Sequence, residues 1–261
     1  MKNITKSAAV LVAIFLFVSC NNDDSTINNL SGTGNLGIEF DNSFAGNELT
    51  LNLPNIPTSN DEVLKISTVK YIISNIVLYD ESGASYTYPK SQSYFIVDES
   101  DETTHVIDLN NIPAGNYTKI KFGIGVDQPQ YDLGQSNQGS FYDKAQSAGL
   151  MANWDSGYSF IAFDGTFTSQ SVTSESNFSV RARKTDSDYN YKEVILDLPA
   201  RALVRTTITP EIHIVADVAI IIDGVNKIRL SDDATVDSGA KVALVADNVK
   251  TMFSVAHVHN D

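Results

Sequence analysis

The chain has 261 residues with 18 basic and 32 acidic side chains, so its formal net charge at pH 7 is −14. Nucleic acid is therefore not an expected partner, because binding to phosphates requires positive charge. The length suffices for one large domain or two small ones.

The first twenty residues have the pattern of a bacterial lipoprotein signal. Lys2 and Lys6 precede an apolar run, Ala8–Val18, that is too short to span a bilayer, and Cys20 follows it. We expect a signal peptide at residues 1–19, a lipid anchor on Cys20 and a polar tether at residues 20–35. Two alternatives are a secretory leader with an incidental cysteine and an uncleaved anchor. Because Cys20 is the only cysteine, its lipidation would leave the folded part without disulfides or thiolate ligands.

Alternating apolar residues, rich in β-branched and aromatic types, predict mainly β-strands after the tether. We expect one domain at residues 36–261, because no linker-like segment interrupts the chain after residue 35. Short turns and the lack of strand–helix alternation predict an all-β fold, an antiparallel β-sandwich. The expected strands are Leu36–Phe40, Glu48–Leu53, Val63–Tyr79, Ser93–Val97, His105–Leu109, Tyr117–Val126, Tyr158–Phe163, Asn177–Arg183, Glu193–Leu198, Ala202–Ile208, Glu211–Asp217 and Lys241–Val245.

A long polar excursion separates the strand that ends before Asp127 from the strand that begins at Tyr158. Loops of this length are uncommon in compact domains and are usually functional or disordered. Because aromatic residues lie at its end, we expect this loop to be ordered and close to the functional site. Trp154, the only tryptophan, lies in it and also fits a structural role as an aromatic plug at one end of a sandwich.

Four histidines are present, and His257 and His259 form the sharpest local pattern among them. In an extended segment, residues two apart point to the same face, so these two imidazoles can converge on one metal ion. Imidazole suits copper, zinc or nickel. The alternative is a pair of solvated side chains. His105 and His213 alternate with apolar neighbours, and each fits the polar face of a strand.

The acidic clusters Asp186–Asp188 and Asp232–Asp237 make calcium a possible ligand, although both lack the spacing of an EF-hand loop. The sequence contains no nucleophile elbow, zinc-protease motif, P-loop or dinucleotide fingerprint. We therefore expect a binding protein and not an enzyme.

Several segments together resemble the MbnP-like family, whose type members are copper-binding proteins associated with methanobactin genes and whose relatives include lipoproteins of Bacteroidetes. The most specific parts are Ala114-Gly115-x-Tyr117, Phe122-x-Ile124-Gly125-Val126-Asp127 and Trp154-x-x-Gly157-Tyr158. The resemblance implies a secreted all-β domain that binds copper through histidines. It also implies a tryptophan oxidised to kynurenine beside the metal, which would require an oxidising partner.

Carried onto this chain, the resemblance makes Trp154 the candidate for the modified residue, and His257 and His259 match the histidines that end many relatives. Relatives commonly carry Phe-x-x-His-x-Gly after the tryptophan motif, whereas this chain has Phe178-Ser-Val-Arg181. Arginine stays protonated and cannot bind a metal. The lipoprotein signal, followed by acidic residues as in surface lipoproteins of Bacteroidetes, implies the outer membrane, facing the cell surface.

Two functions follow as hypotheses. The first is a surface lipoprotein that binds a metal ion, copper being the expected one, for acquisition or handling. The second is a surface interaction module without a metal, which binds a protein or a glycan. The second is motivated by Arg181 and by turns rich in Tyr, Asn and Ser.

Overall fold

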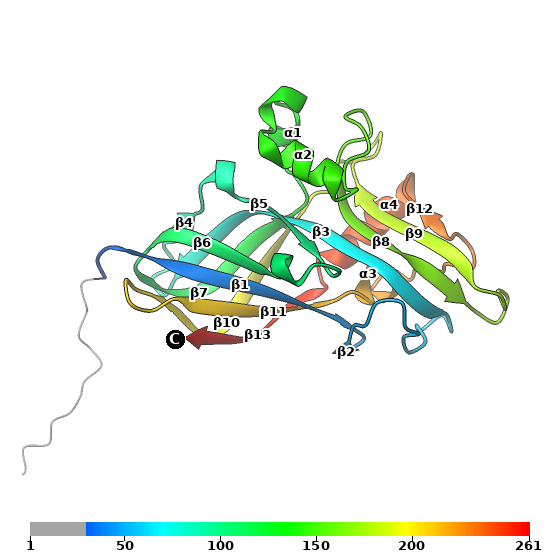
Figure 1. Ribbon diagram of the computed structural model, residues 1–261, viewed down its shortest axis with the longest axis horizontal. Coiled ribbons are helices and arrows are strands. Elements are labelled where there is room, and N and C mark those ends of the chain that lie inside the picture. Colours follow the sequence, from blue (N-terminus) through cyan, green and yellow to red (C-terminus); the bar gives the residue numbers. More distant parts are fainter. Residues whose placement is uncertain (1–29) are drawn as a thin grey trace, which may run out of the picture. The chain divides into compact units, whose positions relative to one another are not determined.

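Two β-sheets face each other in this computed structural model, which describes residues 30–261 (Figure 1). The expected all-β sandwich is confirmed. The predicted signal peptide, Cys20 and most of the predicted tether lie outside the described residues. Within the described part, no helix is both long and apolar enough to cross a membrane.

Sheet A has the strand order β13-β11-β1-β2, and β6 also pairs with β1, on the edge that faces away from β11. Most of its pairings are antiparallel, but β1 and β11 run parallel, with Glu39 opposite His213. The antiparallel prediction therefore does not extend to this central pair. The strands of sheet A are β1 (Thr33–Phe44), β2 (Asn47–Glu48), β6 (Val106–Pro113), β11 (Pro210–Asp217) and β13 (Phe253–Asn260).

Sheet B has the strand order β10-β7-β3-β8-β9-β12, and β4 and β5 pair with the long strand β3. Its strands are β3 (Val63–Asp80), β4 (Ser85–Thr87), β5 (Tyr94–Asp98), β7 (Gly115–Ile124), β8 (Ser159–Thr168), β9 (Ser176–Arg183), β10 (Lys192–Val204) and β12 (Thr235–Val236). The helices are α1 (Gln128–Tyr131), α2 (Ser140–Ser147), α3 (Ile220–Asp223) and α4 (Ala240–Val249), with 3₁₀ turns η1 (Lys90–Gln92), η2 (Glu102–Thr104) and η3 (Gln135–Asn137).

An aromatic cluster fills the space between the sheets. Phe253 of β13 packs edge-on against Phe122, Tyr71 and Phe40, with ring centroids 5.2, 5.7 and 6.1 Å away. All four rings are buried. Edge-to-face pairs of this kind add about 0.5–1.5 kcal/mol each beyond the burial of their surface. The cluster therefore fixes the beginning of β13 to the core.

Several segments differ from the sequence-based expectations. Of the predicted strand Glu48–Leu53, only Glu48 lies in a strand, β2, and the rest is turn and loop. The predicted strand Lys241–Val245 is wrong, because this segment belongs to helix α4, whose buried residues Val242, Val245, Ala246 and Val249 follow the helical spacing. The two strands expected at Glu193–Leu198 and Ala202–Ile208 form one strand, β10, with a register shift between Asp197 and Ala202. The excursion after Asp127 is ordered and contains α1, η3 and α2.

Candidate metal centre

The outer face of sheet A brings together three imidazoles and two carboxylates from three neighbouring strands. Side chains alternate between the two faces of a strand, and the inward positions of β1 and β11 are apolar and buried. The register then places Glu39, His213 and His257 in one row across β1, β11 and β13. Glu211 and His259 stand opposite each other in the adjacent row. Five groups with metal-binding atoms therefore share one patch, which we call the histidine face.

The three imidazoles are in mutual contact. The rings of His213 and His257 stack with centroids 4.4 Å apart and an interplanar angle of 17°. His259 stands nearly perpendicular to both, with its centroid 4.5 Å from that of His257 and 6.0 Å from that of His213. The predicted pair His257 and His259 is thus close together, and the structure adds His213 to it.

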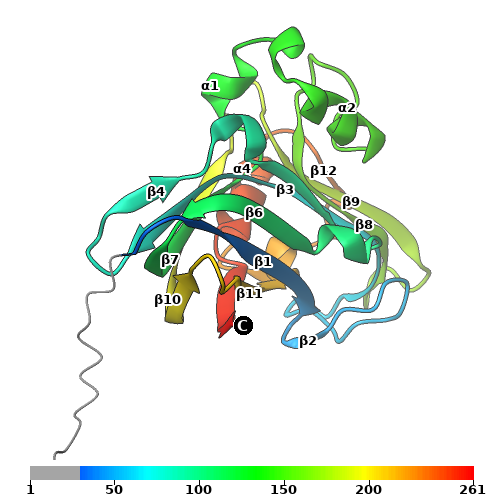
Figure 2. The same cartoon turned by 60° about the vertical axis from the view of Figure 1, so that its left-hand side comes forward.

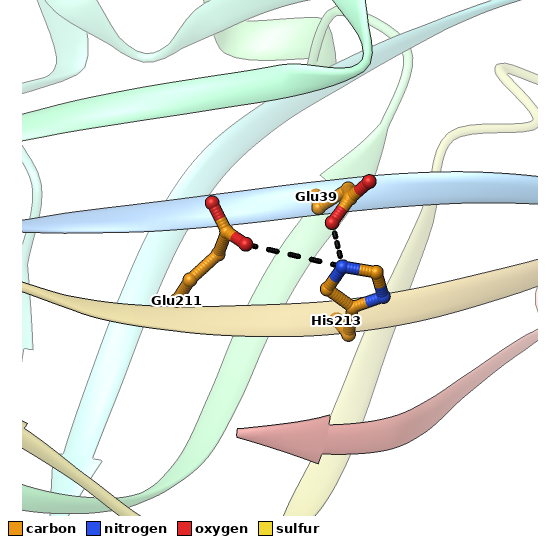
Figure 3. Close-up of side chains that lie close together, drawn as sticks. All are labelled: Glu39, Glu211 and His213. Atoms are coloured by element: carbon orange, nitrogen blue, oxygen red, sulfur yellow. Dashed lines mark ion pairs between the residues drawn. The ribbon is translucent and has the colours of Figure 1, made fainter. Parts of the chain in front are cut away.

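The two carboxylates lie on one side of His213 (Figure 3). Glu39 forms an ion pair with Nε2 of His213, and Oε1 of Glu211 lies 3.9 Å from the same nitrogen. One ligand atom from each of these three residues lies within 4.8 Å of the others. Among the described residues, His213 is the only basic side chain within ion-pair distance of either glutamate. The carboxylates therefore add negative charge that no lysine or arginine of residues 30–261 pairs with.

A glycine makes room for Glu211. Gly37 lies opposite Glu211 in the register, and a Cβ atom at Gly37 would be 3.2 Å from Oε2 of Glu211 and 3.3 Å from its Cγ. The glutamate side chain therefore lies across β1, toward Glu39. Asp108 of β6 stands beyond Gly37 in the same row, so two strand spacings of about 4.8 Å each separate it from Glu211.

A β-bulge turns the terminal histidines to the outer face. Val255 pairs with the inward residue Ile214, whereas His257 pairs with the outward residue His213, and the register shifts between these two pairs. In a regular strand, residues 255 and 257 would point to the same side. The extra residue, Ala256, reverses the alternation, as bulges do when they redirect a side chain.

The far end of β13 is held by its side chain–backbone contacts with β10. The Asn260 amide accepts a hydrogen bond from the backbone N–H of Leu203 at 2.7 Å and donates one to the carbonyl of Arg201 at 3.0 Å. Phe253 anchors the beginning of the strand in the core, as described above. The strand that carries two imidazoles is thus fixed at both ends.

The histidine face is accessible to solvent. The side chains of His213, Glu39 and Glu211 are 23, 30 and 38% exposed, and His257 and His259 are more exposed still. An ion can therefore reach the nitrogen and oxygen atoms directly. A mixed set of imidazole and carboxylate ligands suits Cu(II), Ni(II) and Zn(II), so the residues of the histidine face fit an ion of this class.

Trp154 lies elsewhere. Its ring stacks on Tyr131 of α1, with centroids 4.5 Å apart, and Tyr131 donates a hydrogen bond to its carbonyl at 2.8 Å. Tyr142 and Tyr158 complete this aromatic cluster. Helix α1 and strand β13 lie at opposite ends of both views (Figures 1 and 2). The structure therefore does not bring the indole to the histidines. Trp154 lies just before β8 of sheet B, whereas His257 and His259 lie on β13 of sheet A.

The remaining predicted positions have other partners. His105 lies 3.8 Å from Glu99, whose pKa is raised by burial. Arg181 forms a two-pronged ion pair with Asp164, with N–O distances of 2.6 and 3.0 Å, so its guanidinium is paired with a carboxylate. In the acidic clusters, Asp233 pairs with Lys241. Calcium binding there stays a prediction.

Sequence reasoning missed His213, Glu39 and Glu211 as members of the site. The signal available for them was the alternation Glu211-x-His213, in which both polar residues share a strand face, and the single glutamate at the outward position of Leu36–Phe40. Both patterns also describe ordinary solvated strand faces. Only the neighbourhood of β1, β11 and β13 distinguishes the two cases.

Comparison with known proteins agrees with the resemblance noted in the sequence. A solved structure similar to this chain is MbnP from Methylosinus trichosporium, which is 13% identical over 80% of this chain and 82% of that one, with a TM-score of 0.46. Comparison with curated proteins finds no match. The model of the MbnP family matches residues 33–242, which include β1 and β11 and end before β13. From this match, the chain belongs to the MbnP family.

Proposed function

We propose that this protein binds a metal ion, copper, at the histidine face and presents it at the cell surface. The observation that carries the proposal is the group Glu39, Glu211 and His213, whose ligand atoms lie within 4.8 Å of one another. The rings of His257 and His259 lie against it and can add nitrogen ligands. The imidazoles supply nitrogen ligands, and Glu39 and Glu211 supply oxygen ligands and charge. Family membership supports a role connected with copper. We assign binding and not catalysis, so the ion is the cargo.

Electrostatics favours an occupied site. Two like charges about 4 Å apart repel by about 1 kcal/mol in water and by about 4 kcal/mol at an effective dielectric constant of 20. The oxygen atoms of Glu39 and Glu211 come within 4.8 Å of each other, so a bound cation would replace this repulsion with two attractions. The net charge of −14 on the whole chain also favours binding of a cation, because it raises the local concentration of cations.

We further propose that the protein is anchored in the outer membrane through lipid on Cys20, as the sequence predicts. A membrane anchor would place an accessible metal site outside the cell, where acquisition or handling of copper begins. Labelling with a radioactive or clickable fatty acid tests this point, because a Cys20→Ala variant should lose the label and be released from membranes. A labelled variant would contradict the anchor.

The experiment for the proposed function is a titration of metal-free full-length protein, purified in detergent, with copper. The His257→Ala/His259→Ala double variant and the His213→Ala variant should each lose affinity by at least about tenfold, since even a partner of a metal ligand contributes about 10–100-fold. The matched control is His105→Gln, which removes an imidazole away from the histidine face. Absence of copper binding by the wild-type protein would refute the proposal.

The second candidate function, an interaction module for a glycan or a protein, is favoured by a hollow of about 440 Å³ beside α1. It is lined by aromatic and polar side chains, among them Tyr189, Tyr191 and Lys90. Its size is within the usual range for small-ligand pockets. A glycan array probed with metal-free protein tests this candidate: binding that Tyr189→Ala abolishes and that copper does not change would support it.

A further inference from the structure

The donor atoms of the histidine face differ in chemical hardness, and this difference bears on the oxidation state of the ion. Imidazole nitrogen accepts both oxidation states of copper, whereas carboxylate oxygen suits hard and borderline divalent ions. Glu39 and Glu211 place two such oxygens within 4.8 Å of each other and of His213. The set as a whole is a nitrogen–oxygen set.

Soft sulfur ligands, which select Cu(I), are not offered by the described residues. The only cysteine, Cys20, lies outside them. Met151 and Met252 are each 2% exposed, buried in the core and not on the outer face of sheet A. Nothing in the described part of the chain therefore offers Cu(I) the thioether or thiolate that it prefers.

The negative charge of the histidine face also favours Cu(II) over Cu(I). Attraction between an ion and a carboxylate is proportional to the charge of the ion, so each glutamate attracts a dication twice as strongly as a monocation at the same distance. No lysine or arginine in the described residues lies within ion-pair distance of either glutamate to oppose this. The room provided by Gly37 lets Glu211 lie toward Glu39, so both charges act on one position.

We infer that the histidine face takes copper as Cu(II) in preference to Cu(I), and that Glu39 and Glu211 determine this preference. The inference rests on the proposed function and adds to it the oxidation state of the cargo. The histidines confer affinity for copper in either state, whereas the two carboxylates add more affinity for the divalent ion than for the monovalent one.

The test measures two affinities for each form of full-length protein. Cu(II) affinity is obtained by competition with a Cu(II) chelator, and Cu(I) affinity by anaerobic competition with a chromogenic Cu(I) chelator. The Glu39→Gln/Glu211→Gln double variant keeps the shape of both side chains and removes their charge. Its Cu(II) affinity should fall by at least about tenfold, as for the loss of a group that supports a metal site. Its Cu(I) affinity should fall by a smaller factor, because each carboxylate attracts a monovalent ion half as strongly as a divalent one at the same distance.

The matched control is Asp108→Asn, which removes one carboxylate from the same face two strands away from Glu211. It should leave both affinities unchanged. Electron paramagnetic resonance of bound Cu(II) gives an independent readout, because the wild-type signal should show splitting by nitrogen ligands and the double variant should shift it.

The outcomes separate the two proposals. Unchanged Cu(II) affinity in the double glutamine variant, or an equal loss of Cu(I) and Cu(II) affinity, would overturn the inference and leave the proposed function standing. Tighter binding of Cu(I) than of Cu(II) by the wild-type protein would also overturn it. If the wild-type protein binds neither ion, the proposed function fails as well.

Discussion

The excursion that carries Trp154 depends on Asp127, and replacement of this residue by alanine should lower the free energy of unfolding. The residue is 8% exposed, and its carboxylate accepts hydrogen bonds from Lys90, Tyr94 and Asn75 at 2.7, 2.8 and 2.9 Å. It also accepts a bond from the backbone N–H of Gln130 at 3.2 Å and so caps α1. One carboxylate thereby joins β3, β5, η1 and α1.

The magnitude follows from these contacts. Loss of a helix cap costs about 1 kcal/mol. Tyr94 and Asn75 are neutral donors to a charged group. Each such hydrogen bond contributes about 1.5 kcal/mol to the free energy of unfolding, the lower end of the usual range. The ion pair adds less than about 1 kcal/mol, because the Lys90 side chain is 47% exposed and its charge is screened. The free energy of unfolding should therefore fall by about 4 kcal/mol, which lowers the melting temperature by about 10 °C in a domain of this size.

Urea unfolding at pH 7, followed by tryptophan fluorescence, measures this effect, because Trp154 is in the same excursion. Asp132→Ala is the matched control: Asp132 is an exposed aspartate at the other end of α1, and its removal should cost little. An Asp127→Ala variant that unfolds at the same urea concentration as the wild type would refute the reasoning.

The pH dependence gives a second check. Burial acts to raise the pKa of Asp127, but hydrogen bonds from Lys90, Asn75 and Tyr94 outweigh it and hold the pKa below its ordinary value. A carboxyl group with a lowered folded-state pKa contributes its stability above the unfolded-state value, about 3.9, and loses it as the pH falls through the folded-state value. The difference between wild type and Asp127→Ala should therefore shrink below about pH 4.

Three further predictions concern the site and its support. Trp154→Phe should leave Cu(II) affinity unchanged, because the indole stacks on α1 away from the histidine face; a weakened affinity in the same titration would contradict this. Gly37→Ala should weaken Cu(II) binding, since the new Cβ would displace Glu211, while circular dichroism stays that of the wild type. Phe253→Ala should cost about 3–5 kcal/mol in urea unfolding and speed hydrogen exchange in β13, and unchanged exchange would show that the ring does not anchor the strand.

Most strands could be predicted because their signal is local. The alternation in Leu36–Phe40 and Glu211–Asp217 follows directly from one buried and one exposed face, and the structure places β1 and β11 there. The same local signal failed at Lys241–Val245, because a short run of Val, Ala and Leu fits both a strand and a buried helix. Its burial at the helical spacing becomes visible only when the window extends to Val249.

The site depended on information that alternation does not contain. His257 and His259 could be chosen from their spacing, but their closeness to His213 requires β13 to be the neighbour of β11. The outward direction of both depends on one extra residue, Ala256, and a bulge has no distinctive residue type here. Strand order and bulges result from packing of the whole sheet, so the ligand set could be predicted only in part.

The parallel pairing of β1 with β11 has a consequence for how the protein matures. Parallel neighbours cannot be joined by a hairpin, and here nearly the whole of sheet B is connected between them. Pairings between such distant segments form late and slowly during folding. The full ligand set is therefore assembled only in the folded domain, where β1, β11 and β13 lie side by side.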